Sequence, residues 1–156
     1  MNANPNFTKW LGLFIRQRPR IASAIAYGCV TAVVIHFPWR SDVRWSGNAA
    51  FLTTAGSLTY AIAGAITAPR LITPTQIHGS FTACLVGAGT SLLGVALFAP
   101  LLTTWVWIGN AGSQGWFSLL GMTLLIALFS FLAVGWALLL VSTFLGWGLY
   151  CLARVA

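Results

Sequence analysis

Long apolar stretches without any charged residue dominate this chain. Between Leu71 and Ala153 there is no Asp, Glu, Lys or Arg. About 20 consecutive apolar residues let a helix cross the ~30 Å hydrocarbon core of a bilayer, and the mean hydropathy of the chain is +0.87. Charged residues make up only 6% of the sequence, too few to cover the surface of a soluble domain. We therefore expect an integral membrane protein.

Four apolar segments can be separated along the chain. We predict spans at about residues 21–37, 49–68, 80–99 and 117–150, which makes the fold an all-α, four-helix transmembrane bundle over residues 21–156. Pro38, Pro69 and Pro100 follow the first three spans. Proline ends helices because it lacks the N–H and clashes with the preceding turn, so these residues are expected to close the three helices.

The fourth apolar stretch is too long for one crossing. As a helix from Trp116 to Ala153 it would measure about 57 Å, almost twice the ~30 Å hydrocarbon core. One interpretation is a single long or broken helix that bends near Gly135 or Gly146 and overshoots the membrane from Val141 onward. The other is a tight hairpin near Gly135, which would give five spans. Because residues 134–136 include no polar residue, we favour the single helix.

The first 20 residues read as an amphipathic segment on the cytoplasmic membrane surface. Apolar residues recur there at helical spacing, and basic residues lie on the other side of the helix, which suits anionic lipid headgroups. A targeting presequence is the alternative, since the segment carries Arg and no acid. We do not expect a cleaved signal, because no small-x-small site follows residues 21–37. The apolar stripe comprises Phe7, Trp10, Leu11, Phe14 and Ile15.

Basic residues predict the orientation of the bundle. Lys and Arg concentrate in cytoplasmic loops, so we expect both termini in the cytoplasm, in a bacterial inner membrane. That arrangement leaves Arg40 and Arg44 outside and the other six inside: Lys9, Arg16, Arg18, Arg20, Arg70 and Arg154. Five tryptophans then fall near the outer interface, where tryptophan concentrates: Trp39, Trp45, Trp105, Trp107 and Trp116.

The sequence offers little for catalysis, so we expect neither an enzyme nor a cofactor or metal. Asp42 is the single acidic residue and lies between Arg40 and Arg44, which suggests a local ion pair. No predicted span carries a charge, which argues against proton-coupled transport. His36 and His78 fall at opposite membrane faces, so they cannot hold one metal or haem together, although pigment or haem binding by either alone stays open. Three cysteines show no metal-binding spacing, so we expect small buried apolar side chains there and no disulfide or metal site.

Small residues spaced four apart predict close helix packing. Such faces let backbones approach where lipid provides no hydrophobic drive. We expect the first three spans to pack tightly through residues of this kind, while the fourth, rich in Leu, Phe and Trp, faces lipid or a partner. The expected packing residues are Gly28, Gly56, Gly64, Gly87 and Ser91.

These features favour a non-catalytic membrane subunit that packs into, or regulates, a larger membrane complex or homo-oligomer, with no role in nucleic-acid binding. The partner contact is expected at the cytoplasmic end, through the N-terminal stripe and the predicted overshoot. The alternative is a small oligomeric channel or facilitator for a small solute or anion, lined by Thr53 and Ser57 with Arg70 at the inner mouth. The expected partner contacts are Phe7, Trp10, Leu11, Phe14, Phe144, Trp147 and Tyr150.

Overall fold

A computed structural model describes residues 5–39, 46–72, 79–109 and 116–155, and these residues are almost entirely helical. The predicted all-α membrane bundle is confirmed, because four of the helices are long and apolar enough to cross a membrane. In chain order the elements are α1 (Pro5–Gln17), α2 (Pro19–Trp39), α3 (Ser46–Ile72), α4 (Ser80–Gly109), α5 (Trp116–Ser130), the π-helix η2 (Phe131–Gly135) and α6 (Trp136–Val155).

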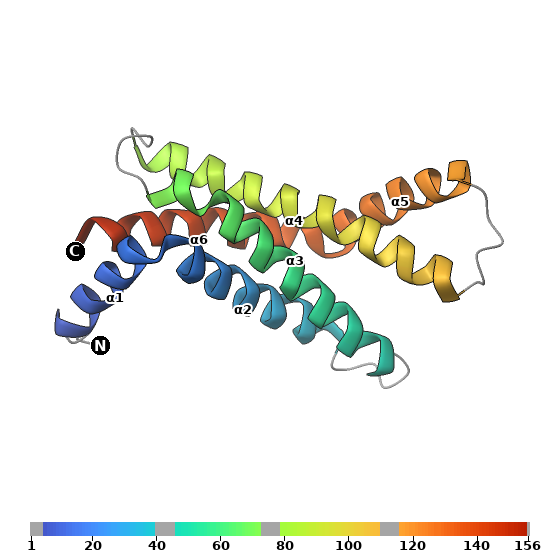
Figure 1. Ribbon diagram of the computed structural model, residues 1–156, viewed down its shortest axis with the longest axis horizontal. Coiled ribbons are helices and arrows are strands. Elements are labelled where there is room, and N and C mark those ends of the chain that lie inside the picture. The colour runs from blue at the N-terminus through green and yellow to red at the C-terminus, as the bar shows by residue number, and fades with distance from the viewer. Residues whose placement is uncertain (1–4, 40–45, 73–78, 110–115, 156) are drawn as a thin grey trace.

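Successive long helices run in alternating directions, so both chain termini lie at the same end of the molecule (Figure 1). α2 packs mainly on α3, while α4 lies between α3 and α6. At the opposite end, α5 packs against the second half of α4 (Figure 1). The four candidate spans are Pro19–His36, Ala50–Arg70, Ser80–Ile108 and Trp136–Arg154.

The prediction that prolines close the helices holds for Pro38, since α2 ends one residue later at Trp39, but was wrong for Pro69 and Pro100. Pro69 lies inside α3, and α4 continues past Pro100 to Gly109. Membrane helices tolerate proline because neighbouring helices and Ser or Thr side chains satisfy the freed backbone groups. Two threonine hydroxyls donate to backbone carbonyls beside the α4 proline, Thr103 to Ala99 and Thr104 to Pro100, each at 2.8 Å.

The fourth apolar stretch is a broken helix rather than a straight rod. α5 leads through η2 into α6, and the chain passes Gly135 without reversing its direction (Figure 1). At η2 the backbone N–H of Trp136 bonds to the carbonyl of Phe131, five residues back. A π-turn of this kind inserts a residue and commonly bends a helix. The helix of spanning length is α6, whereas α5 contains a shorter apolar helix, Leu119–Ser130.

The backbones of α4 and α6 approach each other closely at two glycines. A Cβ added to Gly146 would lie 2.9 Å from the carbonyl oxygen of Ala83 and 2.9 Å from the Cα of Gly87, and one added to Gly87 would meet the carbonyl oxygen of Ser142. Glycine is therefore required at both positions for this spacing. The fourth stretch had been expected to lack a close-packing face, but Ser142 and Gly146 supply one.

Candidate functional site

Three of the seven residues predicted to contact a partner pack within this chain: Leu11, Phe14 and Tyr150. Ile15 of α1 is only 2% exposed and belongs to the same buried cluster as Leu149, Tyr150 and Ala153 of α6, with Leu11 and Phe14 packed against it. One face of the expected overshoot after Val141 is thus part of the core. The reason is physical: α4 accepts α6 closely through its small residues, and α1 covers what remains.

A polar contact also joins α1 to the end of α6. The Nε of Arg16 donates to the carbonyl oxygen of Ala153 at 2.7 Å. A cation near the last carbonyls of a helix complements the negative end of its dipole. The guanidinium of Arg154 lies 4.6 Å from the centre of the Tyr150 ring, within cation–π range. Tyr150 is 6% exposed, so its side chain is not available to a partner.

A different set of aromatic side chains remains on the surface at this end. The rings of Phe7 and Trp10 stack at 6.3 Å, and those of Trp10 and Phe14 at 5.9 Å, along the side of α1 next to its buried face. Phe7 and Trp10 are about 60% exposed, and on α6 Phe144 and Trp147 are exposed as well. The stripe read from the sequence therefore divides into a buried part and an exposed part.

The small residues expected to pack helices all lie at contacts between helices. A Cβ on Gly28 would be 3.3 Å from the Cβ of Ala61, and one on Gly64 would be 3.0 Å from the carbonyl of Ser23. Gly56 faces Ile35, and Gly87 faces Ser142. Ser91 is 1% exposed, and its hydroxyl lies 3.3 Å from that of Tyr60. Thus α3 uses glycine toward α2 and a tyrosine toward α4.

Hydroxyl groups from three helices meet in the middle of the bundle. The Tyr27 hydroxyl of α2 donates to the carbonyl oxygen of Ser142 at 3.4 Å and lies within hydrogen-bonding range of the Thr90 side chain of α4. The Thr90 hydroxyl lies 2.8 Å from that of Thr67 on α3. Tyr27 and Thr90 are 1% and 0% exposed. We call Tyr27, Thr67 and Thr90 the hydroxyl cluster. The sequence reasoning missed Tyr27, because nothing in its spacing marks it as buried.

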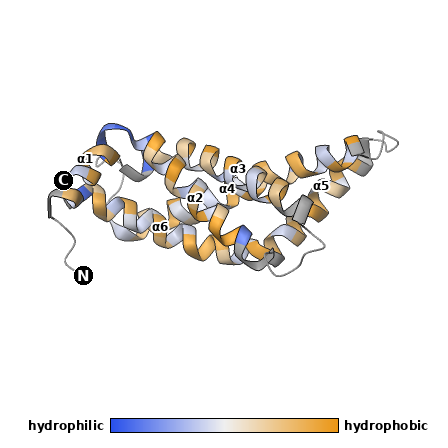
Figure 2. Cartoon of the chain, turned by 90° about the horizontal axis from the view of Figure 1, so that it is seen from below, coloured by the Kyte–Doolittle hydropathy of each residue, from blue (hydrophilic) through white to orange (hydrophobic). Residues whose placement is uncertain are grey.

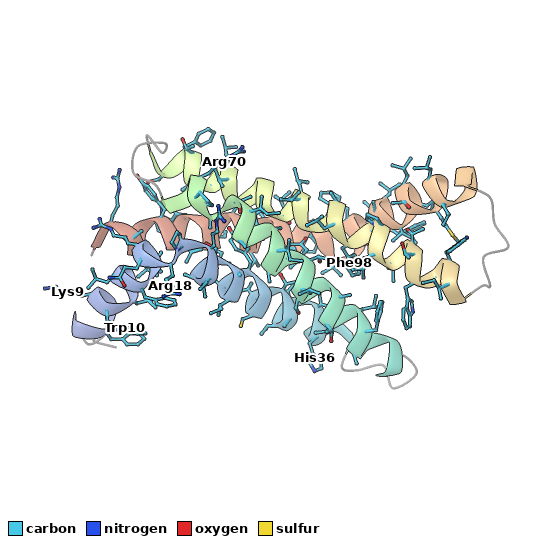
Figure 3. All side chains as sticks on the ribbon, in the orientation of Figure 1. Lys9, Trp10, Arg18, His36, Arg70 and Phe98 are labelled. Carbon is cyan, nitrogen blue, oxygen red and sulfur yellow. The ribbon has the colours of Figure 1, made fainter. Side chains whose placement is uncertain are left out.

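The residues named for a channel are not gathered around one opening. The Ser57 hydroxyl donates to the carbonyl of Thr53 at 2.6 Å, whereas the Thr53 hydroxyl is buried without a hydrogen-bond partner. Arg70 is exposed near the end of α3 at which the termini lie (Figure 3). Most other described threonine hydroxyls in the spans bond to their own helix backbone.

Basic side chains gather at the end that holds the termini. Lys9, Arg18 and Arg70 all lie there (Figure 3), and Figure 2 shows most of the strongly hydrophilic residues near α1. Arg16, Arg20 and Arg154 come from elements at the same end. Arg40, Asp42 and Arg44 fall outside the described residues. Among the residues described, the cations therefore mark one face of the expected membrane.

The histidines and cysteines form no site in the described part of the chain. His36 is exposed, and His78 lies outside the described residues. Cys29, Cys84 and Cys151 are free thiols, and the expectation that all three are buried was wrong, because Cys29 is exposed. Within the described residues, no group of three or more His, Cys, Asp or Glu side chains is placed to hold a metal ion.

An apolar pocket lies where the fourth stretch bends, at the end away from the termini. It encloses about 230 Å³ between α2, α3, α4 and the α5–η2 junction. Six of its lining residues are apolar and Ser130 is the seventh; the apolar ones are Ile35, Leu52, Phe98, Leu102, Phe129 and Val134.

Fold and packing define the class: a multi-pass membrane protein with four apolar helices long enough to span a bilayer. Comparison of the chain with protein-family models, curated proteins and solved structures found no match.

Proposed function

We propose that the chain is a non-catalytic integral membrane subunit that packs, through α5, against another membrane protein chain or a second copy of itself. The observation that carries this proposal is the exposure of α5. Its large side chains point away from the bundle, with Leu120, Leu124 and Leu128 between 57% and 72% exposed. Of the cytoplasmic contact expected from the sequence, Leu11, Phe14 and Tyr150 already pack within the chain, whereas Phe7, Trp10, Phe144 and Trp147 are exposed.

The length of α5 supports the same proposal. Its 15 residues amount to about 22 Å of helix, less than the ~30 Å needed to cross the core alone. Among the described elements, α5 packs substantially on α4 and η2 only. Helices in membranes are held by packing against other helices, since lipid tails are as apolar as leucine. A partner helix would give α5 the second packing surface that the described elements do not provide.

Site-specific photocrosslinking tests the proposal. A benzophenone amino acid placed at Leu124 is expected to capture a protein in native membranes, identified as a heavier band and then by mass spectrometry. Leu85 of α4 is the matched control, since it is an exposed leucine (56%) on the four-helix body. Capture of a protein at Leu124 but not at Leu85 supports the proposal. Labelling of lipid alone at both positions contradicts it.

A channel or facilitator is the second candidate, and the observation in its favour is the hydroxyl cluster at the centre of the bundle. Buried hydroxyls are able to replace the hydration of a small solute. This candidate therefore shifts from Thr53, Ser57 and Arg70 to Tyr27, Thr67 and Thr90. Purified protein in liposomes provides the test: a solute flux that Thr90→Val abolishes favours a channel, and absence of flux for the small solutes and anions tried removes this candidate.

We further propose that both termini face the cytoplasm of a bacterial inner membrane, where the basic end meets anionic lipid. The support is the shared location of the termini and of Lys9, Arg18 and Arg70, since cytoplasmic segments are rich in Lys and Arg. A reporter fused after Ala156 provides the test: fluorescence of a green fluorescent protein is expected. Activity of fused alkaline phosphatase, which requires export, would contradict the orientation.

A further inference from the structure

The pocket beside η2 exists because the fourth stretch changes direction there. α4 continues as one helix past Phe98 and Leu102, whereas α5 lies out of line with α6 on the other side of the π-turn (Figure 1). Ile35 and Leu52 close the pocket from α2 and α3. Helical π-turns are rare and occur frequently at functional sites. The bend at η2 and the pocket beside it therefore belong to the same candidate site.

The chemistry of the lining excludes water as the main occupant. A buried water needs two to four polar partners, and among the described residues that line the pocket Ser130 is the only one with a polar side chain. By contrast, a dry cavity of about 150 Å³ lined by Leu, Ile and Phe takes up an apolar molecule as large as benzene. At about 230 Å³, this pocket has room for an apolar group somewhat larger than that.

The dimensions exclude a helix as the occupant. A helix with its side chains is about 10–12 Å across, too wide for a space of about 230 Å³ between four elements. A single hydrocarbon chain is narrow enough. The pocket is only partly enclosed, and Phe129 on its rim is 63% exposed, so a chain can enter from the side of the bundle that faces the membrane.

We propose that this pocket binds part of one acyl chain of a membrane lipid, held between Leu102 of α4 and Val134 of η2. The binding is separate from the partner contact at α5, since the pocket is formed within one chain. An acyl chain here would fill the space beneath the bend and hold α5 at its angle to α6.

The experiment uses full-length protein in liposomes that contain a trace of phosphatidylcholine with a photoreactive diazirine in its acyl chain. After irradiation, lipid adducts are mapped by mass spectrometry. Adducts are expected several-fold more often on Leu102 and Val134 than on Leu85 and Leu92, which lie on the exposed face of α4 outside the pocket. Equal labelling of the two sets means ordinary surrounding lipid and overturns the proposal.

A pocket-filling variant gives the second arm. Leu102→Trp should reduce adducts on Val134 several-fold, whereas Leu85→Trp, on the same helix outside the pocket, should leave them unchanged. If Leu102→Trp does not yield a monodisperse protein, Val134→Phe fills the pocket from the other side, with adducts on Leu102 as the readout. Unchanged adducts in a folded filling variant overturn the proposal.

Discussion

The two halves of the last apolar stretch have similar composition but are packed very differently. In α6, Leu138 and Leu149 are 4% and 6% exposed, whereas in α5 Leu124 is 72% exposed. α6 carries Ser142 and Gly146 where it meets α4, and the backbones of the two helices touch there. In α5, a Cβ added to Gly121 would meet nothing within 4 Å.

The difference shows that apolar content and helix packing are separate properties of a membrane helix. Lipid solvates leucine as well as a protein interior does, so apolar residues place a helix in the membrane without fixing its neighbours. Packing is decided by where small residues let backbones approach. α6 has them at its contact with α4, and α5 leaves its glycine facing open space.

The largest expected difference between α6 and α5 is the effect on stability of replacing a glycine in each by leucine. Gly146→Leu forces α6 away from the backbone of α4, because the neighbouring Ala83 carbonyl and Gly87 Cα cannot swing aside. We expect a loss of at least about 3 kcal/mol, the upper range of overpacking, seen as a lower midpoint of unfolding in SDS or as aggregation in mild detergent. Gly121→Leu in α5 should behave like the wild type; if both variants are equally stable, the distinction between the halves fails.

Replacing a leucine by alanine in α6 and in α5 should give the next largest difference in stability. Leu149→Ala removes a buried side chain that packs with Ile15 and Tyr150. We expect a cost of about 1–3 kcal/mol, less than the roughly 2–5 kcal/mol of a water-soluble core, because the unfolded state in lipid keeps its leucine out of water. Leu128→Ala, at a 57% exposed position, should cost under about 0.5 kcal/mol. The SDS unfolding midpoints measure both, and similar losses would argue that α5 is as tightly held as α6.

The membrane fold could be predicted from the sequence because it depends on composition and run length. Uncharged stretches of spanning length leave helices as the answer, and small residues at four-residue spacing indicated Gly28 and Gly87 as contacts. The helix ends could not be read from proline, because Pro69 and Pro100 are tolerated inside membrane helices.

The sequence could not show which apolar surfaces are buried, because leucine is equally well solvated by lipid tails and by a protein interior. The region after Val141 was expected to project from the bundle, yet α1 folds over it and buries Ile15. The hydroxyl cluster was missed for a related reason. Thr67 and Thr90 bond their own backbone as isolated residues would, and only the tertiary structure brings Tyr27 to Thr90.

The smallest expected effect is on the contact between α1 and the end of α6. Arg16→Gln replaces the charged group that donates from its Nε to the Ala153 carbonyl. An interaction of a cation with a helix C-terminus contributes about 0.3–1 kcal/mol at an exposed site and is screened by salt. The variant should therefore lose a few tenths of a kcal/mol to about 1 kcal/mol of folding free energy at low salt and less at high salt, measured as a shift of the thermal unfolding midpoint in detergent.

Arg18→Gln is the matched control, because it removes an exposed cation two residues away and should shift the midpoint less. An equal shift in both variants would mean that net charge, rather than the bond to α6, is responsible, and α1 would then be held to α6 by its apolar contacts.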